Sequence, residues 1–404
     1  MNTRIDRIYE LTRKASEVIY KVLHRTPLDY STSFSRMTGC HVYLKLENMQ
    51  KTGSFKSRGA YFKIHSHLDE ARRMGVVAAS SGNHAQGVAF ASSMLGVKST
   101  IVMPETTPIY KINATRSYGA DVVLYGSVYD DAYRKALEIA EASKAMLVHP
   151  FNDEEVIAGQ GTIGLEIASQ LPDVDAVIVP IGGGGLISGI GVALKKLKPS
   201  VKVIGVEPAA APKYYESRKA GKITSISPSP SLADGVLAKS VGDITYEVMN
   251  QVVDDVVVVN EDSIARAIYL LMERAKIIVE GAGALPLAAM LEGLIANTGK
   301  KVALIISGGN IDLTTLYRVV VRGLANAGRV AMVKLTVPDA PGQLYRALGI
   351  LYRNKCNVIE IKHDRFKPDL PVGYAIVDVV FEAPSKEDVD KVIEELRQAG
   401  FRVN

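Results

Sequence analysis

Short, uninterrupted apolar runs recur through most of this chain, and longer stretches with a helical spacing of apolar residues separate them. Such runs predict strands buried on both faces, whereas a period of about 3.6 residues predicts amphipathic helices. The predicted strands span residues 76–80, 99–103, 121–124, 176–180, 201–206, 252–259 and 302–307. Their alternation with helices indicates an α/β fold whose parallel sheets are covered by helices on both faces.

The pattern changes near residues 324–329, where a segment with glycine and asparagine follows the last helical stretch. Beyond it the chain predicts, in order, a strand, a helix, two strands, a helix and a short closing strand, at residues 333–337, 343–354, 357–364, 372–381, 386–399 and the last few positions. This βαββαβ order is typical of a small α+β domain. We therefore expect one domain of residues 1–325 and a second of residues 330–404.

Composition narrows the possible partners. The 404 residues are 47% hydrophobic and 23% charged, which is ordinary for a globular chain of two or three domains. The net charge of +5 is not gathered into a basic run or an aromatic patch, so we expect no nucleic-acid partner. Two widely separated cysteines, Cys40 and Cys356, indicate neither a disulfide framework nor a zinc site.

No segment predicts export or a membrane span. Residues 1–23 are charged throughout and predict a helix rather than a signal peptide. Residues 176–194 are uncharged, but Pro180 and six glycines fit a strand, a loop and a helix far better than a membrane helix. We expect a cytoplasmic protein that contacts no membrane.

Lys56 is the first candidate for chemistry. It lies in the run Lys51–Ala60, where a Gly-Ser turn leads into what the pattern predicts is the first turn of a helix. The exposed N–H groups and the dipole of a helix start disfavour an ammonium ion. The same position suits a neutral amine of lowered pKa, which imine chemistry requires.

A polar turn, Ser80–Gly87, connects the predicted strand 76–80 to a predicted helix from Val88 to Leu95. It carries hydroxyl groups, the amide of Asn83 and an imidazole. Such a turn can present several N–H groups to a carboxylate and one amide to a ring substituent.

Four consecutive glycines, Gly182–Gly185, follow the predicted strand 176–180 and precede a helix. Bare N–H groups at a helix start bind phosphate well. No lysine followed by serine or threonine comes after them, so this is not a Walker A loop, and the spacing GxGxxG is also absent. Glu207, at the end of the next strand, resembles the ribose-binding acid of a dehydrogenase, which keeps that alternative open.

Ser307 ends the apolar run at residues 302–307 and begins the motif Ser307–Asn310. Ligands of open α/β sheets bind at the carboxyl ends of parallel strands. A serine hydroxyl there is a weak, neutral partner for a ring nitrogen, whereas a carboxylate would keep that nitrogen protonated.

An amine, a glycine-rich phosphate site, an amide-bearing turn and a strand-end hydroxyl together match the groups of pyridoxal 5'-phosphate. Residues from about 5 to 325 resemble the fold-type-II pyridoxal-phosphate enzymes, and most closely the threonine/serine ammonia-lyases, or threonine dehydratases. The resemblance rests on the combination of Lys51–Ala60, Ser81–Gly87, Gly182–Leu186 and Ser307–Asn310.

The resemblance implies a set of cofactor contacts. The implied cofactor-binding residues are Phe55, Lys56, Asn83, Gly182, Gly183, Gly184, Gly185, Leu186 and Ser307. Lys56 would form the imine linkage, Asn83 would contact the ring hydroxyl, and Ser307 would meet the pyridine nitrogen. The glycines and the Leu186 N–H would hold the phosphate.

The resemblance also implies how the substrate is held and transformed. Ser81, Gly82, Asn83 and His84 would bind its carboxylate, and a smaller subdomain of about residues 72–150 would close over it. Lys56 would remove the α-proton, which agrees with its expected free-base character. Ser81, on the other face of the ring, is a second candidate proton-transfer group.

One departure concerns metal binding. Related racemases have a divalent-metal site that begins at a Glu-Pro pair and continues with an aspartate six residues later. This chain has Glu207 and Pro208, but Lys213 stands at the later position. A lysine adds positive charge and offers no ligand, so we expect no magnesium there and expect the Lys213 ammonium in its place.

The C-terminal βαββαβ pattern and the turn Val337–Leu344 resemble an ACT domain. In that family the turn binds small molecules, often amino acids, at dimer interfaces. The resemblance implies an amino-acid effector site at Asp339, Gly342, Gln343 and Asn357, and a homodimer or homotetramer. The alternative is a purely structural dimerisation module.

The sequence therefore predicts a pyridoxal-phosphate enzyme that converts L-threonine to 2-oxobutanoate and ammonia, also acts on L-serine, and is regulated by an amino acid. Racemisation of serine, or another β-elimination or replacement on the same fold, is the nearest alternative. A non-catalytic amino-acid sensor is an alternative of another class, although Lys56, Asn83 and Ser307 argue against it.

Overall fold

The computed structural model describes residues 3–295, 299–366 and 370–403. The chain forms two compact units, residues 1–311 and 312–404. The division falls before helix α14 (Leu313–Asn326), whereas the sequence predicted that the first domain extends to residue 325. Within the described residues, no helix combines the length and apolarity needed to cross a membrane.

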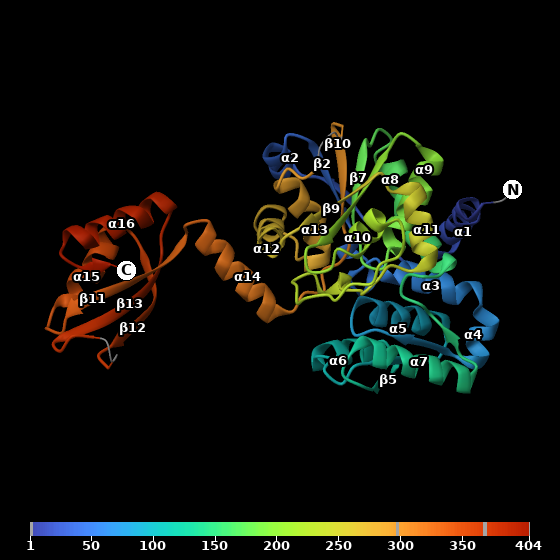
Figure 1. Ribbon diagram of the computed structural model, residues 1–404, viewed down its shortest axis with the longest axis horizontal. Helices are drawn as coiled ribbons and strands as arrows, with labels where there is room; N and C mark the ends of the chain where they lie inside the picture. Colours follow the sequence, from blue (N-terminus) through green and yellow to red (C-terminus); the bar gives the residue numbers. More distant parts are fainter. Residues whose placement is uncertain (1–2, 296–298, 367–369, 404) are drawn as a thin grey trace. The chain divides into compact units, whose positions relative to one another are not determined.

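The larger lobe of the first unit is built on a six-stranded sheet (Figure 1). Its spatial order is β1 (Leu28–Tyr30), β2 (His41–Leu46), β10 (Lys301–Ile306), β7 (Ala176–Pro180), β8 (Lys202–Pro208) and β9 (Asp255–Val259). Only the edge pair β1–β2 is antiparallel. All five residues of β7 are buried, as the uninterrupted apolar run predicted.

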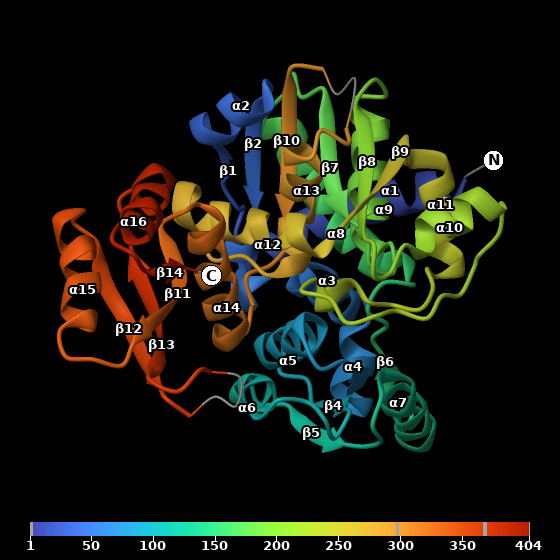
Figure 2. The ribbon, with the colours of Figure 1, turned by 60° about the vertical axis from the view of Figure 1, so that its left-hand side comes forward.

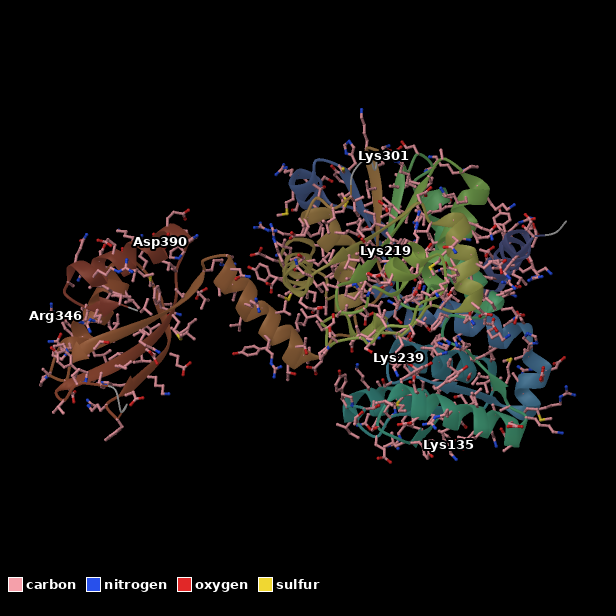
Figure 3. The ribbon with its side chains drawn as sticks, in the orientation of Figure 1. Lys135, Lys219, Lys239, Lys301, Arg346 and Asp390 are labelled. Atoms are coloured by element: carbon pink, nitrogen blue, oxygen red, sulfur yellow. The ribbon has the colours of Figure 1, made fainter. Side chains whose placement is uncertain are left out.

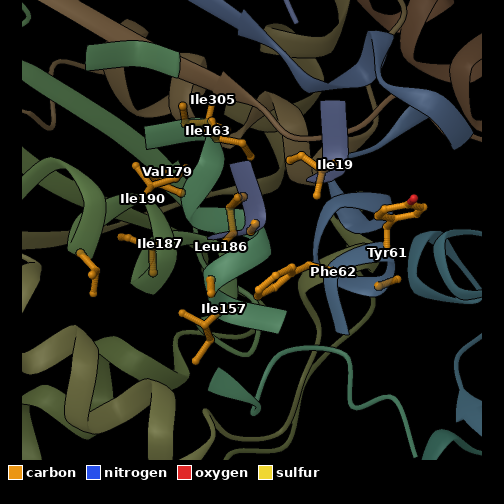
Figure 4. Packing of buried hydrophobic residues seen from close by; sticks show 14 of the residues in the cluster. Ile19, Tyr61, Phe62, Ile157, Ile163, Val179, Leu186, Ile187, Ile190 and Ile305 are labelled. Atoms are coloured by element: carbon orange, nitrogen blue, oxygen red, sulfur yellow. The ribbon is translucent and has the colours of Figure 1, made fainter. Parts of the chain in front are cut away.

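Helices cover this sheet on both faces, which confirms the predicted α/β class. They are α1 (Arg4–Val18), α2 (Thr32–Thr38), α3 (Lys56–Ser66), α8 (Glu154–Gln170), α9 (Gly185–Leu197), α10 (Lys213–Ala220), α11 (Asp243–Val252), α12 (Glu261–Leu270) and α13 (Gly281–Leu291). Helix α4 (Leu68–Met74) instead lies against the smaller lobe. Figure 4 shows how Phe62 of α3, Ile157 and Ile163 of α8, and Leu186 and Ile187 of α9 meet in one apolar core.

A smaller lobe contains a second, wholly parallel sheet with the order β5-β4-β3-β6 (Figure 2). Its elements are β3 (Val76–Ala79), α5 (Asn83–Leu95), β4 (Ser99–Met103), α6 (Ile109–Ser117), β5 (Asp121–Leu124), α7 (Tyr129–Ser143) and β6 (Met146–Leu147). All of them fall within the subdomain predicted at about residues 72–150.

The second unit contains α14 and an antiparallel sheet of order β12-β13-β11-β14. Its elements after α14 are β11 (Val330–Pro338), α15 (Gln343–Arg353), β12 (Asn357–Asp364), β13 (Tyr374–Glu382), α16 (Lys386–Gln398) and β14 (Arg402–Val403). This is the predicted βαββαβ order. Alternate residues of β11 and β13 are buried beneath the two helices, as a half-exposed sheet requires.

The sequence missed three strands and misplaced several boundaries, two of which are informative. Strand β2 was missed because His41 and Lys45 interrupt its apolar run, and β1 and β6 are only three and two residues long. Helix α5 begins at Asn83 rather than Val88, because the polar turn residues themselves form its first turn. Residues 252–254, predicted to be strand, include the end of α11.

A buried network of four charges fixes α3 within the larger lobe. Arg58 donates from Nε to Glu47 Oε2 at 2.8 Å and from Nη1 to Glu166 Oε1 at 2.6 Å. Lys45 Nζ donates to Glu166 Oε2 at 2.5 Å. The four side chains are at most 2% exposed. Because Arg58 lies two residues after Lys56, the network anchors the helix turn that carries Lys56.

Candidate active site

Lys56 is the first residue of α3, as the sequence predicted. Its Nζ donates to the carbonyl oxygen of Pro150 at 2.7 Å. Loss of hydration lowers the pKa of Lys56 to about 8, and the negative charge of Glu280 opposes this shift. A substantial fraction of the amine is therefore unprotonated in mildly alkaline solution, which is the state a nucleophile or a base needs.

Close contact between two helices brings Lys56 to the polar turn. A Cβ added to Gly87 of α5 would lie 3.0 Å from the carbonyl carbon of Lys56 and 3.1 Å from the Ser57 nitrogen. Only a residue without a side chain allows α5 to approach the start of α3 so closely. The turn at residues 81–84 and the amine of Lys56 are therefore held on the same side of the cavity.

The polar turn ends where α5 begins, with Gly82 at the N-cap and Asn83 as the first helical residue. The first N–H groups of any helix lack partners within it, so this end can bind a carboxylate. His84 contributes no positive charge, because burial and the nearby Lys56 lower its pKa to about 3. Its neutral ring makes a 2.8 Å hydrogen bond from Nε2 to the Val148 carbonyl oxygen.

The glycine loop Gly182–Gly185 joins β7 to α9. Gly184 is the N-cap of α9 with a φ of 98°, which favours glycine. A Cβ on Gly183 would lie 2.2 Å from the ring of Phe151, and one on Gly185 would lie 3.0 Å from the Phe151 backbone. The loop therefore needs residues without side chains. Its N–H groups lie at the start of α9, where free N–H groups can bind an anion.

Ser307 follows β10 directly and is 2% exposed. Its carbonyl oxygen accepts a 3.1 Å hydrogen bond from the Phe55 N–H, and the neighbouring residues Ser54 and Gly308 form an isolated β-bridge. The strand-end serine is therefore tied to the residue that precedes Lys56.

A cavity of about 240 Å³ opens between the lobes at these elements. Residues that line it include Asn83, Gln86, Lys111, Asp234, Glu280 and Asn310. Gly82 and Asn83 are predicted site residues that line it. Lys56, the glycine loop and Ser307 are not among its lining residues. Contacts of Lys56 with Gly87 and Pro150, of the glycine loop with Phe151, and of Ser307 with Phe55 nevertheless bring the four motifs close to one another.

The sequence interpretation missed Glu280. It is 5% exposed, and desolvation raises its pKa to about 7, with Asp234 adding to the rise and the bond from Asn83 opposing it. The sequence signal that could have revealed Glu280 is its position as a single acidic residue within the apolar stretch Ile277–Leu287. A lone carboxylate among apolar and small residues is rarely buried without a specific partner.

Two ion pairs cross from the larger lobe to the smaller one. Lys111 Nζ of α6 lies 3.1 Å from Asp234 Oδ2, and Lys239 pairs with Asp130 of α7. Figure 3 shows Lys239 between the two lobes. Asp234 and Lys239 belong to one segment of the larger lobe, so this segment holds the smaller lobe at the edge of the cavity.

Glu207 has a different role from the one that a dehydrogenase would need. Its Oε1 accepts from the Lys213 Nζ and the Tyr214 N–H, each at 3.0 Å, and its Oε2 accepts from the Tyr215 N–H at 2.8 Å. Glu207 and Lys213 are fully buried. The ammonium therefore lies beside Glu207 as expected, and no carboxylate oxygen is available for a ribose.

The four predicted effector residues do not form one cluster within the chain. Asp339, Gly342 and Gln343 lie together where β11 turns into α15, and Asp339 pairs with Arg365 at 2.9 Å. Asn357 begins β12 opposite Glu382, which in turn pairs with Val330 at the far end of β11. The sequence could not reveal this separation, because it depends on the strand register.

Comparison with known proteins identifies the family. Residues 19–308 match the family described as "Pyridoxal-phosphate dependent enzyme". The chain belongs to this family. It is 48% identical over 391 residues to the L-threonine ammonia-lyase of Thermotoga maritima, and the match covers 97% of each chain. The protein is therefore a member of the L-threonine ammonia-lyase family, and the match includes most of the C-terminal unit.

Two solved structures are similar to the larger unit of this pyridoxal-phosphate enzyme. Maize serine racemase has a TM-score of 0.74 and 38% identity over 79% of this chain and 98% of its own. Processed threonine deaminase isoform 2 from Solanum lycopersicum has a TM-score of 0.73 and 39% identity, covering 78% and 92%. The predicted fold type and cofactor are confirmed, and the dehydrogenase alternative is wrong.

The residues of the site fit the cofactor. Side chains at Gly183 and Gly185 would collide with Phe151, so the loop keeps the bare backbone that phosphate binding at a helix start uses. The buried Ser54 Oγ, Thr52 Oγ1 and His84 Nδ1 atoms have no hydrogen-bond partner among the described residues. Unpaired buried polar atoms around a lysine of lowered pKa are expected where a polar ligand belongs.

Proposed function

We propose that this enzyme deaminates L-threonine to 2-oxobutanoate and ammonia, with Lys56 as its catalytic base. The observation that carries the proposal is the geometry at Lys56. An amine with a lowered pKa donates to the Pro150 carbonyl oxygen, next to the Phe151 that packs on the glycine loop. The chain is similar over 97% of its length to an L-threonine ammonia-lyase. Pyridoxal phosphate, when bound, would supply an electron-accepting ring next to the amino group of the substrate.

The chain's own residues would bind the cofactor at three points. The N–H groups of Gly182–Gly185 and Leu186 would hold the phosphate at the start of α9. Ser307 would offer a neutral hydroxyl to the ring nitrogen, and Asn83 would contact the ring hydroxyl. Phe55, which precedes Lys56, would lie against the cofactor.

The polar turn would hold and orient the substrate. The backbone N–H groups of residues 81–84 would bind the threonine carboxylate, because the start of α5 attracts anions and His84 is neutral. This contact would place Cα of the substrate within reach of Lys56 Nζ. Closure of the smaller lobe would exclude water from the cavity.

Lys56 would perform the proton transfer that starts elimination. Its neutral amine would take the proton from Cα of threonine, the electron pair of that bond would form the Cα–Cβ double bond, and the β-hydroxyl group would leave with its bonding electrons. The hydroxyl group would depart as water by taking a proton from the Lys56 ammonium formed in the first step. The unsaturated amine that is released hydrolyses to 2-oxobutanoate and ammonia. Serine, which lacks only the γ-methyl group, would give pyruvate by the same steps.

Ser81 is a second proposed proton-transfer group, on the opposite side of the site from Lys56. Reprotonation of Cα from that side would invert the amino acid, and the similarity to maize serine racemase favours racemisation as a second candidate activity. Release of D-serine from L-serine distinguishes it from elimination.

The C-terminal unit would supply regulation and assembly. Its βαββαβ order and the turn with Asp339, Gly342 and Gln343 support an ACT-like domain that binds an amino acid. Asn357 would join that site only from a second copy of the chain, because it lies at the other end of the sheet. We therefore propose a cytoplasmic homodimer or homotetramer.

The first test is 2-oxo acid release from L-threonine and L-serine, with Lys56→Ala beside the unaltered protein. We expect 2-oxobutanoate from threonine, and a loss of at least about a thousandfold in the variant. Lys51→Ala, at an exposed lysine five residues earlier, is the matched control and should retain activity. If cofactor-loaded protein gives no oxo acid from either substrate, the proposal is wrong.

A further inference from the structure

Glu280 is a buried carboxyl group of the cavity that the proposed reaction does not use. It occupies the N-cap position of α13, where a side-chain oxygen commonly accepts a hydrogen bond from the helix backbone. The Glu280 side chain makes no such bond. Its Oε1 instead accepts from Asn83 Nδ2 at 2.7 Å, between residues 197 positions apart.

A chain of hydrogen bonds starts at a backbone group and ends at this carboxylate. Asn310 Nδ2 donates to the Thr52 carbonyl oxygen at 2.8 Å, so the orientation of the Asn310 amide is set by an acceptor that cannot rotate. The same nitrogen donates to Asn83 Oδ1 at 2.8 Å. Asn83 must therefore turn its oxygen toward Asn310 and its nitrogen toward Glu280.

We propose that Glu280 is a positioning residue that fixes the side-chain amide of Asn83 in one orientation, so that Asn83 meets the cofactor through a defined atom. Reversing the amide would oppose Asn83 Oδ1 to a Glu280 oxygen and Asn83 Nδ2 to a donor on Asn310. With Glu280 ionised, both contacts would be repulsive. One Asn83 Nδ2 proton is used by Glu280, which leaves the second for the ring hydroxyl.

The surroundings of Glu280 are shaped to hold this carboxylate. Its own N–H donates to the Gly308 carbonyl oxygen at 3.1 Å, and a Cβ on Gly308 would lie 2.4 Å from Glu280 Oε1. The charged groups that influence it are Lys56 and Lys111, which favour the ionised form, and Asp234, which disfavours it. None of the three is hydrogen-bonded to it, so the Asn83 amide is its specific partner among the described residues.

The test compares Glu280→Gln with Glu280→Leu, and the inference rests on the proposed function. Glutamine keeps an acceptor oxygen at the same position in a side chain of equal length, whereas leucine has no acceptor. We expect Glu280→Leu to weaken pyridoxal-phosphate binding by about tenfold or more and to change the visible circular dichroism of the bound cofactor. Glu280→Gln should remain within about threefold of the unaltered protein. Glu292→Gln and Glu292→Leu, at the other end of α13, are the matched controls.

Unchanged cofactor binding in Glu280→Leu would overturn the inference. Equal loss in both variants would also overturn it, because charge rather than acceptor geometry would then be responsible. If Glu280→Leu does not fold, hydrogen exchange at Asn83 in the cofactor-free, unaltered protein, labelled with 15N-asparagine, still tests the inference. One Asn83 Nδ2 proton should exchange with water more slowly than its partner, and equally fast exchange would contradict the inference.

These outcomes are separate from the fate of the proposed function. Cofactor affinity and amide exchange do not depend on which substrate is turned over. A protein that binds pyridoxal phosphate through an ordered Asn83 but releases no 2-oxobutanoate would refute the ammonia-lyase proposal and support the role of Glu280.

Discussion

Two titratable side chains in the site influence one another. Burial lowers the pKa of Lys56 and raises that of Glu280, and each charge partly offsets the shift of the other. The sequence predicted the lowered lysine pKa from its place at a helix start. It could not predict the partner, because Asn83, Asn310 and Glu280 meet only after three distant segments fold together.

The pKa of Lys56 predicts how the cofactor-free protein reacts with an amine-specific reagent. The neutral amine is the reactive form, so the rate of Lys56 modification should rise with pH through a midpoint near 8. In Glu280→Gln the midpoint should fall below that value, because the carboxylate that favours the ammonium form has been removed. Peptide mapping by mass spectrometry measures the rate at Lys56 alone. A midpoint near the ordinary lysine value of 10.5 would contradict the described environment.

At the scale of elements, strands formed by one short apolar run were the most predictable. The boundaries of β4, β5 and β7 were predicted to the residue, because each is a single apolar run between polar turns. Strand β2 was not predicted, because Lys45 is buried through contacts with α8 that the local pattern does not contain. Helix α5 was predicted too short because its first turn is made of the polar residues of the turn. Local patterns therefore predicted the scaffold better than the places where elements meet.

The contact between the glycine loop and Phe151 gives a prediction about packing. Gly183→Ala places a methyl group where the Phe151 ring lies, so we expect weaker cofactor binding and a free energy of unfolding lowered by about 1–3 kcal/mol. The combined variant Gly183→Ala/Phe151→Ala should recover part of the cofactor affinity, because the ring is gone. Gly349→Ala in α15, where a Cβ would approach only Arg353 Nη1 at 3.7 Å, is the control and should not destabilise the protein. Denaturant titration and cofactor titration provide the two measurements.

The whole molecule joins a catalytic unit to a second unit with its own core. Among the described residues, fifteen buried apolar side chains form that core, and they come from the strands, helices and connecting segments after residue 330. The sequence predicted this unit from a change in pattern alone, since βαββαβ order is a local property. The identity of the amino acid that this unit would bind depends on the side chains around the turn at residues 338–343. The pattern of apolar and polar residues does not predict how those side chains are arranged.

The turn gives a prediction about regulation of the full-length protein. We expect at least one of the twenty amino acids, each added separately, to change the rate of threonine deamination. Asp339→Asn and Gln343→Ala should remove that response and leave the basal rate unchanged. Asp390→Asn, on α16 and outside this turn (Figure 3), is the control and should respond normally. An undiminished response in both turn variants would exclude this turn as the effector site.

The order of strands in the larger sheet has a consequence for synthesis of the chain. β10 is the last of the six strands to be made, yet it lies between β2 and β7 near the centre of the sheet. During synthesis on the ribosome, β2 and β7 therefore each lack a neighbouring strand on one side until residue 306 has emerged. The four strands of the smaller sheet, by contrast, come from one continuous stretch of the chain. The smaller lobe can form during translation, whereas the sheet of the larger lobe remains incomplete until its central strand has been made.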